Sequence, residues 1–260
     1  MRNYISLIVV ILLFTSCEKV LDLKLDNTEP RVVIESFFTD QNRQHPVSIS
    51  YTTDFDAETK KIPATGATVV VREENGPVIT FSESSPGNYL SARYRGRPGR
   101  KYTITVTLNG QTYTATSIMP SPVAIKSLGL AELSFFGNTR KVVQLNYSDP
   151  AGIANFYYTR AFVNGLKRDQ FFVDSDRFTD GREVKNSISL DEPDLVPKDE
   201  VKIQFFTIDQ NVYRFLFSIT QITGNGGPPT VPANPTSNFN NGALGFFSAS
   251  TFAEDTIVIN

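Results

Sequence analysis

Residues 102–110 read Tyr-Thr-Ile-Thr-Val-Thr-Leu-Asn-Gly, and this stretch decides the fold class. Apolar side chains alternate with threonines from Tyr102 to Leu108, which is the period of a half-buried β-strand. Asn109-Gly110 then supplies the residue pair most typical of a two-residue hairpin turn. The run from Thr112 to Ile118 follows directly, so we expect an antiparallel β-hairpin here.

Similar short runs precede this hairpin, and Gly, Pro or Asn marks most of the gaps between them. With the hairpin they make seven short strands within about ninety residues, which is typical of a β-sandwich. We therefore predict an immunoglobulin-like or transthyretin-like sandwich over residues 30–119. The additional strands are expected at 31–38, 46–51, 67–72, 78–82 and 88–92.

Met119-Pro120-Ser121-Pro122 predicts a connector, because two prolines this close together do not fit a central strand. A second β-rich domain is expected over residues 123–260, so that the fold class is all-β with two domains. Its predicted strands lie at 123–133, 141–147, 155–163, 170–173, 183–190 and 200–208.

One segment of the second half has a helical period. After Asp209, an expected N-cap, apolar residues recur at spacings of three and four from Val212 to Ile222. This pattern predicts a single helix at 210–223.

The first sixteen residues have the character of a signal peptide. Arg2 supplies a positive charge and residues 5–14 form an apolar run that is too short to span a bilayer. Cys17, the only cysteine, follows at the position where a lipoprotein would carry its acyl chains, and residues 17–29 are then a lipidated tether. The alternative is an ordinary cleaved signal followed by a free thiol, which is a liability in a secreted protein.

The composition limits the functions to consider. The net charge is −2 with both signs scattered along the chain, so no nucleic-acid partner is expected. His45, the only histidine, stands beside Pro46 and is expected to be a solvated residue at the start of a strand. The nucleophile-elbow, zinc-protease, P-loop and dinucleotide-binding patterns do not occur, so we expect no catalytic site, no cofactor and no metal site.

A hydrolase is the less favoured alternative function, because the chain is rich in carboxylates and a glycosidase needs only two of them. Asp174-Ser175-Asp176 with Asp180-Gly181 also partly matches a calcium-binding loop, for which a solvated turn is favoured and a weak surface Ca²⁺ site is the alternative. The acidic candidates stand in loop-like stretches and are expected to be solvated: Asp54, Asp56, Asp174, Asp176, Asp191, Glu192 and Asp194.

Phenylalanine often occurs in adjacent pairs. Neighbours on a strand face opposite sides, so one ring is expected in the core and the other under a second layer or on a contact surface. Burial of both rings between layers is the favoured interpretation for any one pair. The pairs are Phe37-Phe38, Phe135-Phe136, Phe171-Phe172, Phe205-Phe206 and Phe246-Phe247.

The segment from Gly224 to Phe247 joins a Pro/Asn/Gly-rich loop to a less polar stretch. It is either a ligand-facing or partner-facing surface, or an extended strand that covers the edge of the sandwich, and both interpretations stay open. In the first case the expected contact residues are Asn225, Asn234, Asn238, Asn240, Asn241 and Phe246.

Several segments in order resemble one family, the Bacteroidota lipoproteins grouped as domain of unknown function 4249. The resemblance covers most of the chain. It rests on Cys17-Glu18-Lys19, Arg31 to Glu35 with Thr39-Asp40-Gln41, Pro63 to Val71, Gly87-Asn88-Tyr89, Gly99 to Val106, Asp149-Pro150 with Asn155 to Tyr158, and Ser237-Asn238 with Gly242 to Phe247.

The resemblance implies an outer-membrane lipoprotein that works with a TonB-dependent receptor in nutrient uptake, and it supplies no catalytic residues. Our leading expectation is therefore an accessory or ligand-binding protein anchored in the outer membrane by lipid. The alternative is a structural or adhesive protein of the cell envelope.

Overall fold

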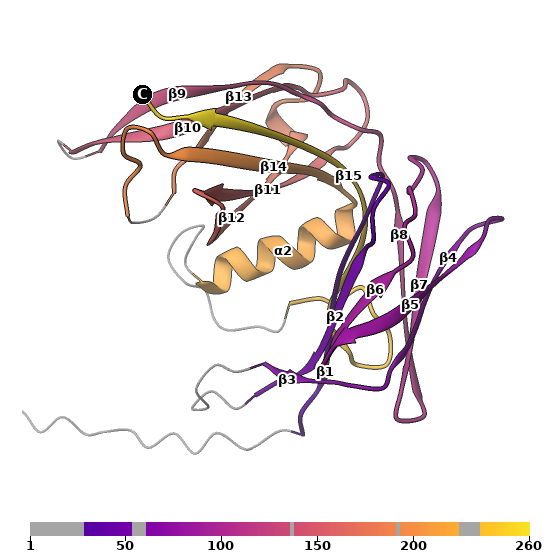
Figure 1. Ribbon diagram of the computed structural model, residues 1–260. Helices are drawn as coiled ribbons and strands as arrows, with labels where there is room; N and C mark the ends of the chain where they lie inside the picture. The colour runs from indigo at the N-terminus through magenta and orange to yellow at the C-terminus, as the bar shows by residue number, and fades with distance from the viewer. Residues whose placement is uncertain (1–28, 54–60, 136–137, 191–192, 224–234) are drawn as a thin grey trace, which may run out of the picture.

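The fold is described from a computed structural model, which covers residues 29–53, 61–135, 138–190, 193–223 and 235–260 (Figure 1). In these residues the chain forms a 12-stranded sheet, a 3-stranded sheet, one α-helix and one short 3-10 helix. The predicted all-β class with a single α-helix is confirmed.

The first half contains the strands that the alternating patterns predict. Burial alternates along β7 as the threonines and apolar residues do, and Asn109 and Gly110 turn the chain into β8 with φ angles of 51° and 78°. The strands are β1 (Val32–Thr39), β2 (Pro46–Tyr51), β3 (Ile62–Pro63), β4 (Thr68–Glu73), β5 (Val78–Ser85), β6 (Asn88–Ser91), β7 (Lys101–Leu108) and β8 (Gln111–Ile118).

The second half supplies the remaining elements. The three-stranded sheet has the order β13-β10-β9, and the large sheet runs β12-β11-β14-β15-β1-β2-β6-β5-β4-β7-β8, with β3 beside β2. The elements are β9 (Ile125–Phe135), β10 (Asn138–Ser148), β11 (Phe156–Val163), β12 (Leu166–Ser175), η1 (Asp176–Phe178), β13 (Glu183–Ile188), β14 (Glu200–Ile208), α2 (Gln210–Thr223) and β15 (Leu244–Val258).

Strand β15 joins the two halves; an extended strand was one of the two interpretations for its first residues, 244–247, and no strand was predicted for residues 248–258. Its first part, from Leu244 to Ser250, pairs in parallel with β1, and its second part, from Thr251 to Val258, pairs antiparallel with β14. Figure 1 shows this long yellow strand running from the first half across the second. One sheet therefore passes through both predicted domains, and the C-terminal segment completes the pairing of β1.

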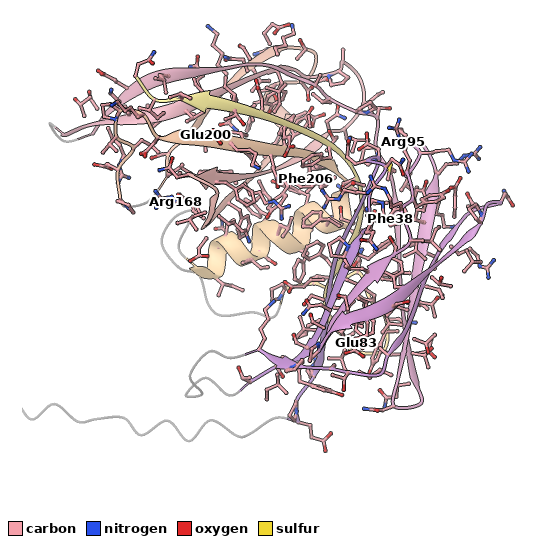
Figure 2. The ribbon with its side chains drawn as sticks, in the orientation of Figure 1. Phe38, Glu83, Arg95, Arg168, Glu200 and Phe206 are labelled. Atoms are coloured by element: carbon pink, nitrogen blue, oxygen red, sulfur yellow. The ribbon has the colours of Figure 1, made fainter. Side chains whose placement is uncertain are left out.

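Three apolar clusters fill the fold. The first lies inside the curled strands of the first half and includes Phe38 and Phe247, and the second lies between the three-stranded sheet and the β11-β14 face that carries Phe205. The third packs α2 against the opposite face of β11 and β14 and against β1, and it includes Phe206 and Phe246. Figure 2 shows Phe206 beside α2 and Phe38 within the first half.

Each described phenylalanine pair is divided between two of these clusters, because neighbouring side chains on a strand point to opposite faces. The expected arrangement, with one ring in each of two layers, is therefore observed. The divided pairs are Phe37-Phe38, Phe171-Phe172, Phe205-Phe206 and Phe246-Phe247.

The helix α2 has the predicted bounds and the predicted cap. The Asp209 carboxylate accepts hydrogen bonds from the N–H groups of Asn211 at 2.8 Å and Val212 at 3.0 Å, which satisfies two free donors of the first turn. Val212, Phe215 and Leu216 face the third cluster. In the described part of the chain, no helix has the length and apolar character needed to cross a membrane.

Candidate functional site

Helix α2 fills only part of the angle between the two halves of the large sheet, and a cleft of about 340 Å³ remains beside it. Phe37 of β1, Tyr158 of β11 and Phe171 of β12 line it, together with Leu216 of α2. Ligand sites in proteins are commonly concave, of a few hundred Å³ and lined by aromatic groups. This cleft is therefore the candidate functional site.

The aromatic wall of the cleft is a connected set of rings. Phe37 stacks on Tyr158 with centroids 5.2 Å apart and planes at 15°, and it meets Phe246 edge-on at 4.9 Å. Tyr158 also contacts Phe171 at 5.6 Å. Rings that support one another in this way lose little freedom when a ligand binds, so the wall is preorganised.

Arg160 places a positive charge in this wall. Its Nε donates a hydrogen bond to Gln204 Oε1 at 2.7 Å, and its guanidinium carbon lies 5.1 Å from the centroid of Phe206. Burial lowers the pKa of Arg160 below its usual value, an effect that the neighbouring Tyr158 opposes. Because an arginine stays protonated near neutral pH, the cleft holds a partly desolvated cation.

The other charges of the cleft lie nearer its opening and largely offset one another. Lys167 and Asp169 of β12 are exposed, and both line the cleft. The Glu35 carboxylate accepts from Lys61 Nζ at 2.6 Å. Arg160 is therefore the partly buried charge of the cleft, and Glu254 favours its charged form from a longer distance.

Of the residues predicted to contact a ligand, Phe246 lines the cleft and is 5% exposed. Asn238, Asn240 and Asn241 instead bind the chain's own backbone. Cys17, Asn225 and Asn234 lie outside the described residues.

The three asparagines hold the segment that leads into β15. Asn238 pairs with the backbone of Phe247, donating from Nδ2 to the carbonyl at 2.8 Å and accepting from the N–H at 3.0 Å. Asn240 Oδ1 accepts from Thr114 N–H at 2.7 Å, and Asn241 Nδ2 donates to the Thr112 carbonyl at 2.7 Å. These bonds match the interpretation in which residues 237–247 cover the edge of the sandwich.

His45 is not solvated, so the sequence-based prediction is wrong on this point. The ring is 0% exposed and packs on Phe38 with centroids 4.4 Å apart. Its Nδ1 accepts from Thr39 N–H at 3.3 Å, and its Nε2 lies 2.9 Å from the Tyr94 carbonyl, so Nε2 carries the proton. Burial lowers the pKa of His45 to about 4, which keeps the ring neutral.

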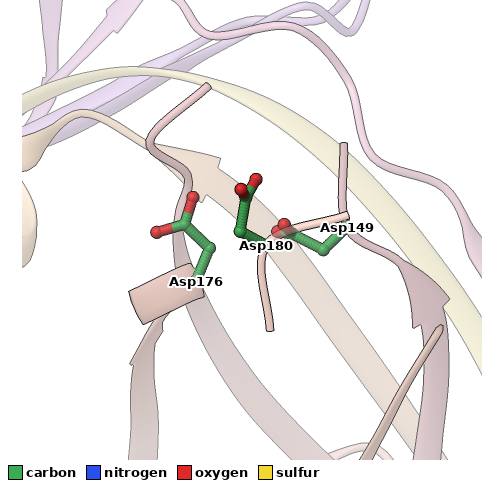
Figure 3. A group of neighbouring side chains, drawn as sticks. All are labelled: Asp149, Asp176 and Asp180. Carbon is green, nitrogen blue, oxygen red and sulfur yellow. The ribbon is translucent and has the colours of Figure 1, made fainter. Parts of the chain in front are cut away.

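The expectation of a solvated acidic turn near residue 176 is also wrong in part. Asp149 and Asp176 are only 4% and 9% exposed, and oxygens of Asp149, Asp176 and Asp180 lie within 4.8 Å of one another (Figure 3). Each carboxylate accepts a hydrogen bond from a backbone N–H group. Asp149 accepts from Gly181 at 3.2 Å, Asp176 from Asn155 at 2.7 Å, and Asp180 from Gly152 at 2.7 Å. The cluster thus ties the loop before β11 to the loop after η1.

Of the remaining acidic candidates, the two that the structure describes, Asp174 and Asp194, lie outside the cleft lining. Asp174 is half-buried, its carboxylate accepts from Asn186 Nδ2 at 2.8 Å, and burial raises its pKa. Asp194 pairs with Arg140 at 2.6 Å. Asp54, Asp56, Asp191 and Glu192 lie outside the described residues.

The fold and the cleft define an all-β protein in which two halves of one sheet flank an aromatic site that holds a partly buried arginine. The chain belongs to the family of the domain of unknown function 4249 (DUF4249), whose profile matches residues 18–256. The comparison with curated proteins gave no match.

Among solved structures, the chain is similar to a two-domain fibronectin type III segment of chicken tenascin, at 11% identity and a TM-score of 0.22, over 68% of this chain and 90% of that one. It is also similar to the adhesin InvE of Yersinia pseudotuberculosis, at 14% identity and a TM-score of 0.23, over 68% of this chain and 55% of that one.

Proposed function

We propose that this chain is an outer-membrane lipoprotein of the Bacteroidota, anchored through Cys17, that binds a ligand or partner in the aromatic cleft and works with a TonB-dependent receptor in nutrient uptake. The observation that carries the binding role is the ring set Phe37, Tyr158, Phe171 and Phe246, which lines a cleft of about 340 Å³ that α2 leaves open. The receptor partnership and the membrane location rest on the resemblance and on residues 1–17.

Binding without catalysis suits the chemistry of the cleft better than hydrolysis does. A glycosidase needs two carboxylates facing one substrate position. In the cleft, Glu35 is held by Lys61 and Asp169 stands exposed near the opening beside Lys167. The cluster of Asp149, Asp176 and Asp180 lies outside the cleft lining, and backbone N–H groups occupy oxygens of all three carboxylates.

The anchor is tested by fractionation. Cys17→Ala removes the thiol that carries the acyl chains and should release a folded protein into the soluble fraction. The wild-type protein should stay in the membrane fraction after a salt wash. A Cys17→Ala variant that also stays there would contradict lipid anchoring.

The cleft is tested by affinity purification from detergent-solubilised outer membrane. The wild-type protein should retain a TonB-dependent receptor, and Phe171→Ala should reduce that retention at least fivefold, because the variant removes one ring from the wall. Leu166→Ala is the matched control, since Leu166 is an apolar residue of the same strand that is 75% exposed and lies outside the cleft lining. Equal retention by all three proteins would place the contact elsewhere.

A further inference from the structure

We infer that the cleft takes a small organic anion with a flat apolar body, with its acidic group against Arg160 and its body against the aromatic wall. This inference rests on the proposed binding role and adds the chemical class of the ligand.

The charge of Arg160 is the first step of the argument. In the described part of the chain no carboxylate oxygen lies within 4.0 Å of its guanidinium nitrogens, while Nε is fixed by Gln204. Glu254, which accepts from Gln204 Nε2 at 3.0 Å, favours the charged form of Arg160 from a longer distance. A guanidinium that has lost part of its water and has no carboxylate in direct contact interacts strongly with an arriving carboxylate, which its planar fork can bind through two nitrogens.

The neighbouring Tyr158 adds a second polar group. Tyr158 is 6% exposed, and its hydroxyl lies near enough to Arg160 for the cation to lower the phenol pKa against the raising effect of burial. A guanidinium only donates hydrogen bonds, so the Tyr158 hydroxyl can accept from Arg160 and keep its own proton for a ligand oxygen. Arg160 and Tyr158 stand two residues apart on β11 and therefore share the face that lines the cleft.

The shape of the wall selects the rest of the ligand. Tyr158 is covered by Phe37 on one face, while Phe37 and Phe171 are themselves only half-buried, so the open parts of these two rings offer apolar surface close to the charge to a flat ring or a short apolar chain. The other charged residues of the cleft add no net charge, because Lys167 and Asp169 carry opposite signs and Glu35 is paired with Lys61. The cleft therefore favours one negative charge on an apolar body over a cation or a highly charged ligand.

The test compares two probes of the same shape, 2-naphthoate and its neutral analogue 2-naphthamide. Binding to the detergent-solubilised full chain is followed by ligand-observed NMR titration, with protein-free detergent as the blank. The wild-type protein should bind 2-naphthoate about tenfold more tightly than 2-naphthamide, in line with one charge-assisted contact.

Variants then assign the effect to the cleft. Arg160→Gln should weaken 2-naphthoate binding about tenfold and change 2-naphthamide binding less than twofold, and Tyr158→Phe should weaken 2-naphthoate binding two- to threefold. Lys167→Gln is the matched control, because Lys167 is an exposed cation of the same cleft and should contribute less than twofold. Arg160→Lys, which keeps the charge and loses the fork, replaces the glutamine variant if that one fails to fold, and it should give an intermediate loss.

The outcomes separate this inference from the proposed function. The wild-type protein could bind both probes equally, with Arg160→Gln leaving this binding unchanged and Phe171→Ala weakening it. That result would overturn the anionic class of the ligand and keep the cleft as a binding site. Absence of binding by either probe would count against both proposals. Preference for 2-naphthoate that survives Arg160→Gln and Arg160→Lys would overturn the role given to Arg160.

Discussion

The Ser117 hydroxyl of β8 donates a hydrogen bond to the carboxylate of Asp209, the residue that caps α2. The same Ser117 oxygen accepts from the N–H of Ala249 in β15 at 2.8 Å. Three elements distant in sequence therefore meet at one buried hydroxyl, and α2, which forms part of the cleft wall, is fixed to β8 and β15.

Asp209→Ala should lower the free energy of unfolding by about 2–3 kcal/mol, because it removes the cap of two N–H groups and leaves Ser117 without its acceptor. Urea unfolding followed by circular dichroism measures this change. Asp209→Asn, which keeps one side-chain acceptor, should lose less. A change below about 0.5 kcal/mol in the alanine variant would show that the cap contributes little to stability.

His45 should make stability depend on pH in a window set by its own titration. Its pKa is lowered from 6.5 to about 4, so the unfolded chain binds the proton first as pH falls through this range. The contribution of the neutral, buried ring is complete above pH 6.5 and is lost progressively down to about pH 4. A shift of this size corresponds to about 3 kcal/mol.

His45→Gln isolates this effect, because the chain has one histidine and the carboxylates titrate in both proteins. The difference in unfolding free energy between wild type and variant, measured at pH 7, 5.5 and 4.5, should shrink as pH falls. A difference that stays constant over these three values would mean that His45 is not held neutral by the fold.

The β1–β15 pairing predicts a position that tolerates only glycine. Gly245 has a φ of +91°, and a Cβ atom there would lie 2.0 Å from the Ile34 carbonyl oxygen. Gly245→Ala should therefore cost more than about 3 kcal/mol through strain and a backbone clash together. Gly165→Ala is the control, since Gly165 has a φ of +80° and open space around it, and it should cost about 1 kcal/mol. Similar unfolding midpoints in urea for both variants would contradict the close approach of the two strands.

The sequence predicts the elements whose signals are local. The β7–β8 hairpin follows from Asn109-Gly110, and α2 follows from an apolar stripe behind Asp209. Strand β15 has no such signal, because residues 245–251 are buried on both faces and so lack the alternation of a half-buried strand. Its parallel partner β1 stands at the other end of the chain, and only tertiary structure brings the two together.

The candidate site is predictable only in part, because residues distant in sequence form it. Phe246 was identified from its aromatic stretch, whereas Tyr158 and Arg160 were missed. Their period-two spacing was visible within the predicted strand at 155–163, but the sequence does not show which face of that strand the helix leaves uncovered. The sequence left the asparagines open between ligand contacts and an edge-covering strand, because the backbone groups that they satisfy belong to strands distant in sequence or to the start of β15.

Asn238 separates a structural role from a binding role for this segment. Because its amide both donates to and accepts from the Phe247 backbone, Asn238→Ala should lower the free energy of unfolding by about 2 kcal/mol. Asn238→Asp keeps an acceptor but loses the donor and should be destabilised as well, while Asn241→Ala, at an exposed residue with one bond to Thr112, should lose 1 kcal/mol or less. Urea unfolding of the three variants gives these values, and titration with 2-naphthoate gives the second readout.

Asn238→Ala should bind the probe as the wild type does, since Asn238 lies outside the cleft lining. A variant of unchanged stability that no longer binds the probe would return Asn238 to the ligand-contact role predicted from the sequence.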